Sequence, residues 1–143
     1  MKRLLLLPAI FCLIACSRPK IASSLAEYIE HDYLEIKDKE IVWSDLFSKD
    51  DHYYCYIYSD YCTHCENIKN QVIEKALSID NFYFIHFQKD IPIFTDITAT
   101  IGETDIDKMG ILGTPTLIEI ENHAISNHVA GEKEVLILFE KIQ

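Results

Sequence analysis

Hydrophobic positions in the middle of the chain change their period twice. An aromatic run over 53–58 has the length of a strand, and apolar residues at Ile68, Val72 and Ile73 then recur at helical spacing. A nearly continuous apolar run over 82–87 follows, which is typical of a strand covered on both faces. The order predicts a strand, a helix and a second, parallel strand joined by a right-handed crossover.

The C-terminal part of the chain has the pattern of a hairpin followed by an amphipathic helix. Strands are predicted over 116–121 and 124–129, and Asn122 and His123 form the tight turn between them. After a glycine, apolar positions over 132–142 recur on one face of a helix. Together with the crossover unit, this pattern predicts an α/β domain.

The remaining segments have weaker patterns. We expect a short helix over 24–30, a strand over 41–43 and a helical turn over 44–47. The segment over 90–109 lacks one clear period, and its end, over 103–109, predicts a short helix. These elements would connect the crossover unit and the hairpin to the rest of the chain.

The start of the chain predicts export and a lipid anchor. Lys2 and Arg3 precede an apolar run over 4–14, which is shorter than the ~20 residues of a membrane-spanning helix and typical of a signal peptide. The run ends in an apolar residue, a small residue and Cys16, which resembles the bacterial lipoprotein box. In that box the cysteine is acylated, for example with palmitate, and becomes the mature N-terminus. An ordinary signal peptide with a chance cysteine is the alternative.

These features divide the chain into a signal peptide over 1–15, a tether with an N-terminal helix over 16–32, and one domain over 33–143. Loss of the signal leaves eleven basic and twenty-three acidic residues, a formal charge of −12. So acidic a domain repels nucleic acid and anionic lipid surfaces. We therefore expect no nucleic-acid partner and a membrane contact through the lipid on Cys16. The protein would be extracytoplasmic, on the cell membrane or on an outer membrane.

Cys62 and Cys65 are the candidate reactive groups. They lie two residues apart, between the predicted strand over 53–58 and the helix after it. In an exported protein such a pair is a redox site, a structural disulfide or part of a zinc site. A disulfide across so short a loop removes little chain entropy, and no second pair has metal-ligand spacing. The pattern favours a redox pair with no cofactor or metal, and Cys55 is expected to be a small buried residue.

The cysteine pair at the first crossover helix, with Gly113-Thr114-Pro115-Thr116 before the hairpin, resembles the thioredoxin fold family. The resemblance covers roughly residues 40–142. It implies a three-layer α/β/α fold with a mixed central sheet of about four strands. It also implies that Pro115 is a cis-proline beside the cysteines, and the alternative is a trans proline that starts a strand.

The resemblance and the helix N-terminus assign roles to five residues. Cys62 would be the nucleophile, because free backbone N–H groups and the helix dipole favour its thiolate. Cys65 would be the buried resolving thiol, and the two would form the redox-active disulfide. His64, when protonated, would tune the acidity of Cys62, unless it is only a solvated residue. Pro115 would keep metal from the thiols, and Thr114 would offer its backbone to an extended peptide substrate.

These roles predict a thiol–disulfide oxidoreductase that exchanges disulfides with exported proteins and with a membrane redox partner. His64 resembles the histidine in the Cys-Pro-His-Cys of strongly oxidising periplasmic oxidases, which favours oxidase or isomerase over reductase activity. The alternatives are a non-catalytic envelope accessory protein with this fold, for example for peptide export, and a metal-handling module.

One position departs from the family pattern. Family members commonly bury an acidic residue six positions before the first cysteine, where it can move protons for the second. Tyr56 occupies that position here. We expect Tyr56 to be a core residue with a satisfied hydroxyl rather than a proton relay.

Overall fold

The computed structural model describes residues 29–49 and 51–142. A four-stranded sheet in the order β2-β1-β3-β4 forms its centre. The strands are β1 (His52–Tyr58), β2 (Phe82–His86), β3 (Thr116–Glu121) and β4 (Ala124–Ala130). β1 pairs in parallel with β2 and antiparallel with β3, and β3 pairs antiparallel with β4. The α/β class, the mixed sheet of four strands and the parallel crossover are therefore confirmed.

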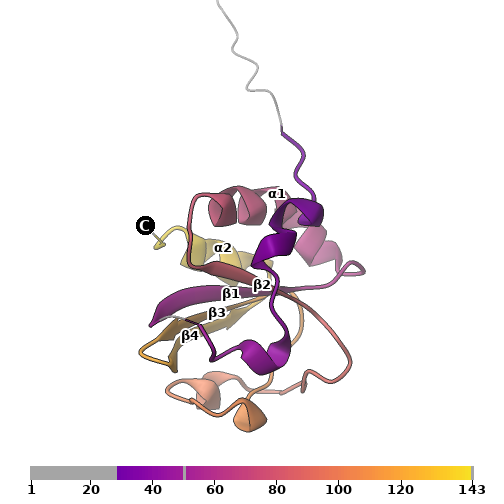
Figure 1. Cartoon of the computed structure of the whole chain (residues 1–143). Coiled ribbons are helices and arrows are strands. Elements are labelled where there is room, and N and C mark those ends of the chain that lie inside the picture. Colours follow the sequence, from indigo (N-terminus) through magenta and orange to yellow (C-terminus); the bar gives the residue numbers. More distant parts are fainter. Residues whose placement is uncertain (1–28, 50, 143) are drawn as a thin grey trace, which may run out of the picture.

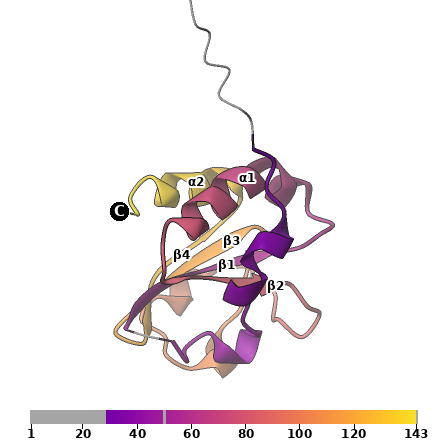
Figure 2. The ribbon, with the colours of Figure 1, turned by 45° about the horizontal axis from the view of Figure 1, so that its top comes forward.

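Two α-helices cover one face of the sheet (Figures 1 and 2). α1 (Thr63–Leu77) connects β1 with β2, as the helical spacing after the cysteine pair predicts. α2 (Glu132–Phe139) follows β4 and packs against α1. It ends at Phe139, before the predicted boundary at Ile142, and Glu140 is its C-cap. Ile142 is nevertheless buried in the same cluster.

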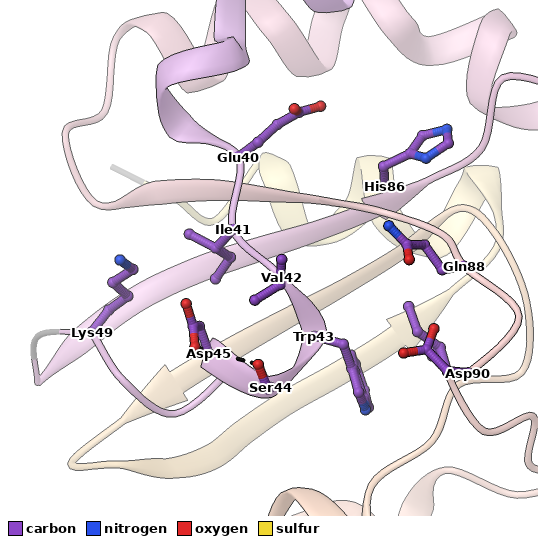
Figure 3. A pocket seen from close by; sticks show the side chains of 11 residues that line it. Glu40, Ile41, Val42, Trp43, Ser44, Asp45, Lys49, His86, Gln88 and Asp90 are labelled. Carbon is purple, nitrogen blue, oxygen red and sulfur yellow. Dashed lines mark hydrogen bonds between the residues drawn. The ribbon is translucent and has the colours of Figure 1, made fainter.

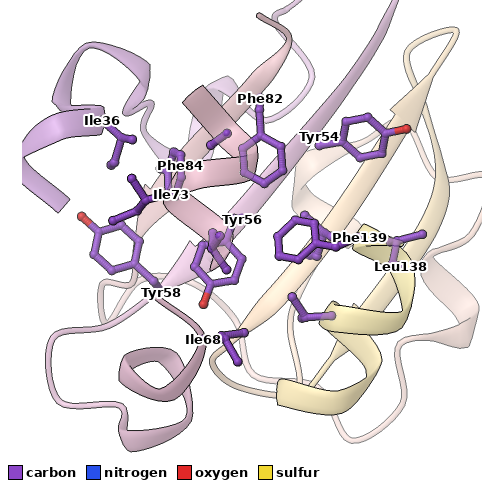
Figure 4. Packing of buried hydrophobic residues seen from close by; sticks show 14 of the residues in the cluster. Ile36, Tyr54, Tyr56, Tyr58, Ile68, Ile73, Phe82, Phe84, Leu138 and Phe139 are labelled. Atoms are coloured by element: carbon purple, nitrogen blue, oxygen red, sulfur yellow. The ribbon is translucent and has the colours of Figure 1, made fainter. Parts of the chain in front are cut away.

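β1 lies in the middle of the sheet, and its side chains alternate between two buried clusters. The cluster on the helix face contains aromatic residues of β1 and β2 together with apolar residues of α1 and α2 (Figure 4). The side chains of β1 on this face are Tyr54, Tyr56 and Tyr58, and those on the opposite face are Tyr53, Cys55 and Ile57. The aromatic run therefore supplies the core on both faces.

The opposite face of the sheet is covered by short 3-10 helices and the segments that connect them. These helices are η2 (Trp43–Asp45), η3 (Thr98–Thr100) and η4 (Ile106–Lys108). Leu46, Met109 and Ile111 are fully buried against this face. The prediction of a helix over 103–109 was wrong in extent: only η4 forms, because Met109 is already extended, with φ −96° and ψ 147°.

A further 3-10 helix, η1 (Tyr33–Lys39), lies before β1 and packs against α1 and β2. Asp32 caps it, accepting a hydrogen bond from the Leu34 N–H at 2.8 Å. The strand predicted over 41–43 does not form. Instead Glu40 makes an isolated parallel bridge with Phe84 at the outer edge of β2, and η2 begins at Trp43. A bridge of one residue leaves the chain free to turn toward the opposite face.

The predicted signal peptide over 1–15, Cys16 and most of the helix expected over 24–30 lie outside the described residues. Within the described part of the chain, no helix is both long enough and apolar enough to span a membrane.

The hairpin between β3 and β4 turns at Asn122 and His123, as predicted. Both residues have positive φ, 53° and 61°, the conformation that two-residue hairpin loops require. At the other end of β4, Gly131 has φ 102° and directly precedes α2. This glycine brings the first turn of α2 close to the start of α1.

Candidate active site

Cys62 is the N-cap residue of α1. The turn after β1 is closed by the Cys62 N–H, which donates to the Ser59 carbonyl at 3.1 Å. The Cys62 sulfur accepts a hydrogen bond from the Cys65 N–H, also at 3.1 Å. The side chain is partly exposed and the thiol is free. A thiolate here would be reachable from solvent and stabilised by the helix N-terminus.

Cys65 has a different environment although it lies in the same helical turn. Its side chain is 1% exposed and belongs to the cluster between the helices and the sheet. Burial, and then the interaction with Cys62, raises the pKa of Cys65 to about 12. Its thiol is therefore protonated at neutral pH and out of reach of a large substrate.

The loop before β3 lies against Cys62. The Cys62 thiol donates to the Thr114 carbonyl at 3.2 Å, and the Thr114–Pro115 peptide bond is cis. The Pro115 carbonyl accepts the Gly131 N–H at 2.8 Å, which ties this loop to the start of α2. The structure thus brings together the two cysteines, Thr114 and Pro115, from segments about fifty residues apart in the sequence.

His64 is exposed and faces the first turn of α2. Its Nδ1 lies 3.1 Å from Oε2 of Glu132, and the Asn67 side-chain amide donates to the same oxygen at 3.1 Å. The hydrogen bonds from Asn67 and then from His64 lower the pKa of Glu132. Glu132 therefore offsets part of the positive charge that a protonated His64 would present to Cys62. Asn67 and Glu132 were not identified from the sequence, because no local pattern relates them to His64.

A groove of about 490 Å³ adjoins Cys62 and is lined by residues from three segments. Phe87 and Ile93, from the segment after β2, form part of it beside Thr114. The surrounding surface exposes large apolar side chains, with Tyr61 99% and Ile93 58% exposed. Clustered exposed apolar groups mark a surface for binding another molecule.

Tyr56 lies behind the cysteine pair and is fully buried in the aromatic cluster. The expectation that its hydroxyl is satisfied was wrong, because the oxygen is buried without a hydrogen-bond partner within the described residues. Its neighbours on the helix face are largely apolar or aromatic, and β1 directs the hydroxyl into the interior. Cys55, on the opposite face, is fully buried, and burial raises the pKa of its thiol. It is the small buried residue that was predicted.

A second hollow lies beside the outer edge of β2 and is separate from the thiols (Figure 3). It is lined by the segment over 40–45, by His86 at the end of β2 and by residues after this strand, including Asp90. Within the described ranges, no group of three or more histidine, cysteine, aspartate or glutamate side chains is arranged to hold a metal ion.

No protein-family model matches this sequence, and a comparison with curated proteins gives no significant match. Similar solved structures are thioredoxins. That of Plasmodium falciparum is 16% identical, with 73% of this chain and 99% of that chain covered and a TM-score of 0.49. That of Aeropyrum pernix is 21% identical, with 71% of this chain and 81% of that chain covered and a TM-score of 0.48. Spinach chloroplast thioredoxin f is 13% identical, with 72% of this chain and 84% of that chain covered and a TM-score of 0.47. At these identities and TM-scores, the likeness carries no conclusion about this chain.

The topology of this chain is the thioredoxin-like arrangement that its own sequence predicts. The strand order β2-β1-β3-β4, the parallel crossover through α1 and the position of the cysteine pair at the start of α1 agree with the expectation from the sequence. What a thioredoxin-like chain does depends on its own site, and the activity is therefore argued from the two thiols.

Proposed function

We propose that this protein is a thiol–disulfide oxidoreductase that acts through Cys62 and Cys65. The observation that carries the proposal is the contrast between the two thiols: Cys62 is accessible at the N-cap of α1, and Cys65 is buried one turn away. An accessible thiolate is the group that attacks a disulfide, and a protected neighbour is the group that releases the product.

In the reducing direction, the Cys62 thiolate attacks a substrate disulfide, and one substrate sulfur leaves as a thiol. Cys65 then attacks the Cys62 sulfur, which forms the Cys62–Cys65 disulfide and releases the second substrate sulfur. In the oxidising direction the same steps run backwards. Thr114 and Pro115 hold the loop at Cys62, where an extended peptide could pair with the backbone, as in strand addition.

We propose that the protein acts as an oxidase or isomerase rather than as a reductase. The support is His64, whose charge when protonated favours the Cys62 thiolate and so the reduced form, which makes the disulfide a stronger oxidant. The hydrogen bond to Glu132 moderates this contribution. The measurement that decides the direction is the reduction potential of the pair: about −120 mV is typical of strong oxidants and about −270 mV of thioredoxin.

We further propose that the substrates are exported proteins and that the domain works at a membrane surface, with a membrane redox partner that regenerates it. The support is the signal-like start of the chain and Cys16 at its end. Mass spectrometry of the mature N-terminus would show an acylated Cys16 if the chain is a lipoprotein. It would show an unmodified Cys16 if the start of the chain is an ordinary signal peptide.

The activity is tested with three variants. The wild-type protein should oxidise, reduce or isomerise a test protein, and the Cys62→Ser variant should not. The Cys65→Ser variant should trap a mixed disulfide with its substrate in cells, because Cys62 attacks but cannot be released. Cys55→Ala is the matched control, since this thiol lies on the opposite face of the sheet, and it should retain activity. If wild type is inactive and Cys65→Ser traps nothing, the enzyme proposal is wrong.

The exposed apolar side chains beside Cys62 also fit a docking role without catalysis. Tyr61 and Ile93, which line the groove at Cys62, are 99% and 58% exposed. A double variant, Cys62→Ser with Cys65→Ser, separates the two functions in cells that lack the gene. Full restoration of the phenotype by this variant would favour an accessory role, and failure would favour exchange chemistry.

A further inference from the structure

Two tyrosine hydroxyls behind Cys65 are not used in the mechanism above. Tyr56, in β1, is fully buried, and Tyr33, the first residue of η1, is partly buried. Within the described residues, both hydroxyl oxygens are buried and neither has a hydrogen-bond partner at standard geometry. Burying a hydroxyl without a partner is unfavourable, and native proteins leave few such groups. The pair therefore calls for an explanation.

The two tyrosines come from different elements, and both lie in or against the buried cluster that contains Cys65. Tyr56 and Cys65 belong to the same buried cluster, and Tyr33 packs against it (Figure 4 shows Tyr56 and Tyr58). The Tyr33 ring stacks on Tyr58 with 3.8 Å between centroids, and the rings of Tyr56 and Tyr58 are nearly parallel, with 6.4 Å between centroids. This stack fixes both rings, so that η1 contributes directly to the site.

Both hydroxyls remain protonated over the physiological range. Burial raises the pKa of Tyr56 well above its usual value, and Tyr33 and then Cys65 raise it further. Burial and then Cys65 likewise raise the pKa of Tyr33. Neither tyrosine can therefore act as a base, but each can donate a hydrogen bond to a neighbouring anion.

Burial and then the hydrogen bond with Cys62 raise the pKa of Cys65, whereas hydrogen bonds involving Ser59 and then Thr114 lower it. Cys62, on α1, is the other thiol, and Glu66, on α1, is an exposed carboxylate that acts on Tyr33. Among the described residues, the buried members of this cluster on β3 and α2 are apolar: Leu117, Val135, Leu138 and Phe139. The tyrosine hydroxyls are buried donors near the thiol, in addition to the groups at Ser59 and Thr114.

We propose that the Tyr56 hydroxyl donates a hydrogen bond to the Cys65 thiolate as it forms during release of the mixed disulfide, with Tyr33 as a positioning residue for Tyr56. The inference rests on the proposed exchange activity and adds a catalytic residue to it. The Cys65 thiol loses its proton, its sulfur bonds to Cys62, and the bond from Cys62 to the substrate sulfur breaks. The proton ends on the released substrate thiol, so the substrate is reduced, the protein dithiol is oxidised, and Tyr56 keeps its own proton.

The test follows two kinetic phases with dithiobis(nitrobenzoate), whose coloured thiolate is released once when Cys62 attacks and once more when Cys65 attacks. Tyr56→Phe removes only the hydroxyl. A lost hydrogen bond to a charged group should slow the second phase by about tenfold or more, and leave the first phase unchanged. The thiolate fraction of Cys65 rises about tenfold per pH unit below its pKa in wild type and variant alike. The second phase of Tyr56→Phe should therefore stay slower than that of wild type at each pH between 6 and 9. Tyr33→Phe should slow the same phase less.

Tyr58→Phe is the matched control, because the Tyr58 hydroxyl in the same aromatic stack donates to Glu40 and not toward Cys65. It should leave both phases unchanged. Urea unfolding should show Tyr56→Phe to be as stable as wild type or more so, which distinguishes lost catalysis from damaged packing. A second phase in Tyr56→Phe that equals wild type would overturn the inference while the proposed function stands. The rate at which buried Cys55 reacts can be measured in Cys62→Ser. If the first phase in wild type were as slow as this reaction, the proposed function itself would be wrong.

Discussion

The accessible side of the site and the buried side behind it use the same residue types for different purposes. Cys62 lies at the surface between the helix N-terminus and the Thr114 carbonyl, and Cys65, in the same helical turn, is 1% exposed. Tyr61 is 99% exposed at the groove, and Tyr56 is fully buried behind it. The difference shows that reactivity here is set by depth and by neighbouring dipoles rather than by the identity of the side chain.

The largest expected effect is the difference in reactivity between the two thiols. Since the pKa of Cys65 is raised to about 12, only about one thiol in ten thousand is ionised at pH 8, and access is blocked as well. Brief alkylation of the native protein should therefore label Cys62 well before Cys65 or Cys55. Peptide mass spectrometry measures the order. Equal labelling of Cys62 and Cys65 in the folded protein would remove the distinction.

Aromatic residues on the two sides should differ in their effect on stability. Phe84→Ala removes a fully buried ring that contacts Tyr33, Tyr56 and Tyr58, and should lower the free energy of unfolding by about 3–5 kcal/mol. Tyr61→Ala should change it by no more than about 0.5 kcal/mol. Urea unfolding measures both. If Tyr61→Ala were as destabilising as Phe84→Ala, the groove would belong to the core.

The comparison extends to histidines. His128 is buried with Nδ1 2.7 Å from the Thr100 hydroxyl, and burial lowers its pKa to about 4. The unfolded chain binds this proton near pH 6.5, so the contribution to stability is complete above that pH and is lost as the pH falls toward 4, by about 3 kcal/mol. His128→Gln should reduce this loss in unfolding measured at pH 7 and pH 4. His64→Gln changes a histidine at the exposed site and serves as the control.

The smallest expected effect concerns Glu132. Glu132→Gln leaves the charge of protonated His64 unbalanced beside Cys62, and should make the reduction potential less negative by under about 30 mV. Equilibration with glutathione buffers measures the shift. Glu134→Gln removes a carboxylate from the same turn of α2 and serves as the control. A shift toward more negative potential in Glu132→Gln alone would contradict the role given to His64.

Much of the fold could be predicted from local patterns, because each central element has a strong period of its own. The aromatic run of β1, the apolar spacing of α1 and the turn at Asn122 and His123 were all located correctly. The structure of the segment over 90–109 could not be predicted, because its residues pack individually against the opposite face of the sheet and follow no helical or strand period.

The candidate site was predicted in part. The cysteine pair, Thr114 and Pro115 have local sequence signatures, and the structure places Thr114 3.2 Å from the Cys62 sulfur. Glu132 and Tyr33 have none, because they reach the site from α2 and η1 across long stretches of chain. Tyr56 was placed correctly in the core, but its missing hydrogen-bond partner depends on which groups the fold brings around it.

The sequence by itself determined the order of the central elements and the position of a reactive pair at the start of a helix, because hydrophobic period and cysteine spacing are local properties. Only the tertiary structure decided what surrounds each thiol. Packing of α1 against β1 and η1 buries Cys65 beside two tyrosine hydroxyls that lack a hydrogen-bond partner among the described residues, and the loop before β3 brings a carbonyl to Cys62. These contacts join residues distant in sequence, and they control the ionisation of the thiols through burial and hydrogen bonding.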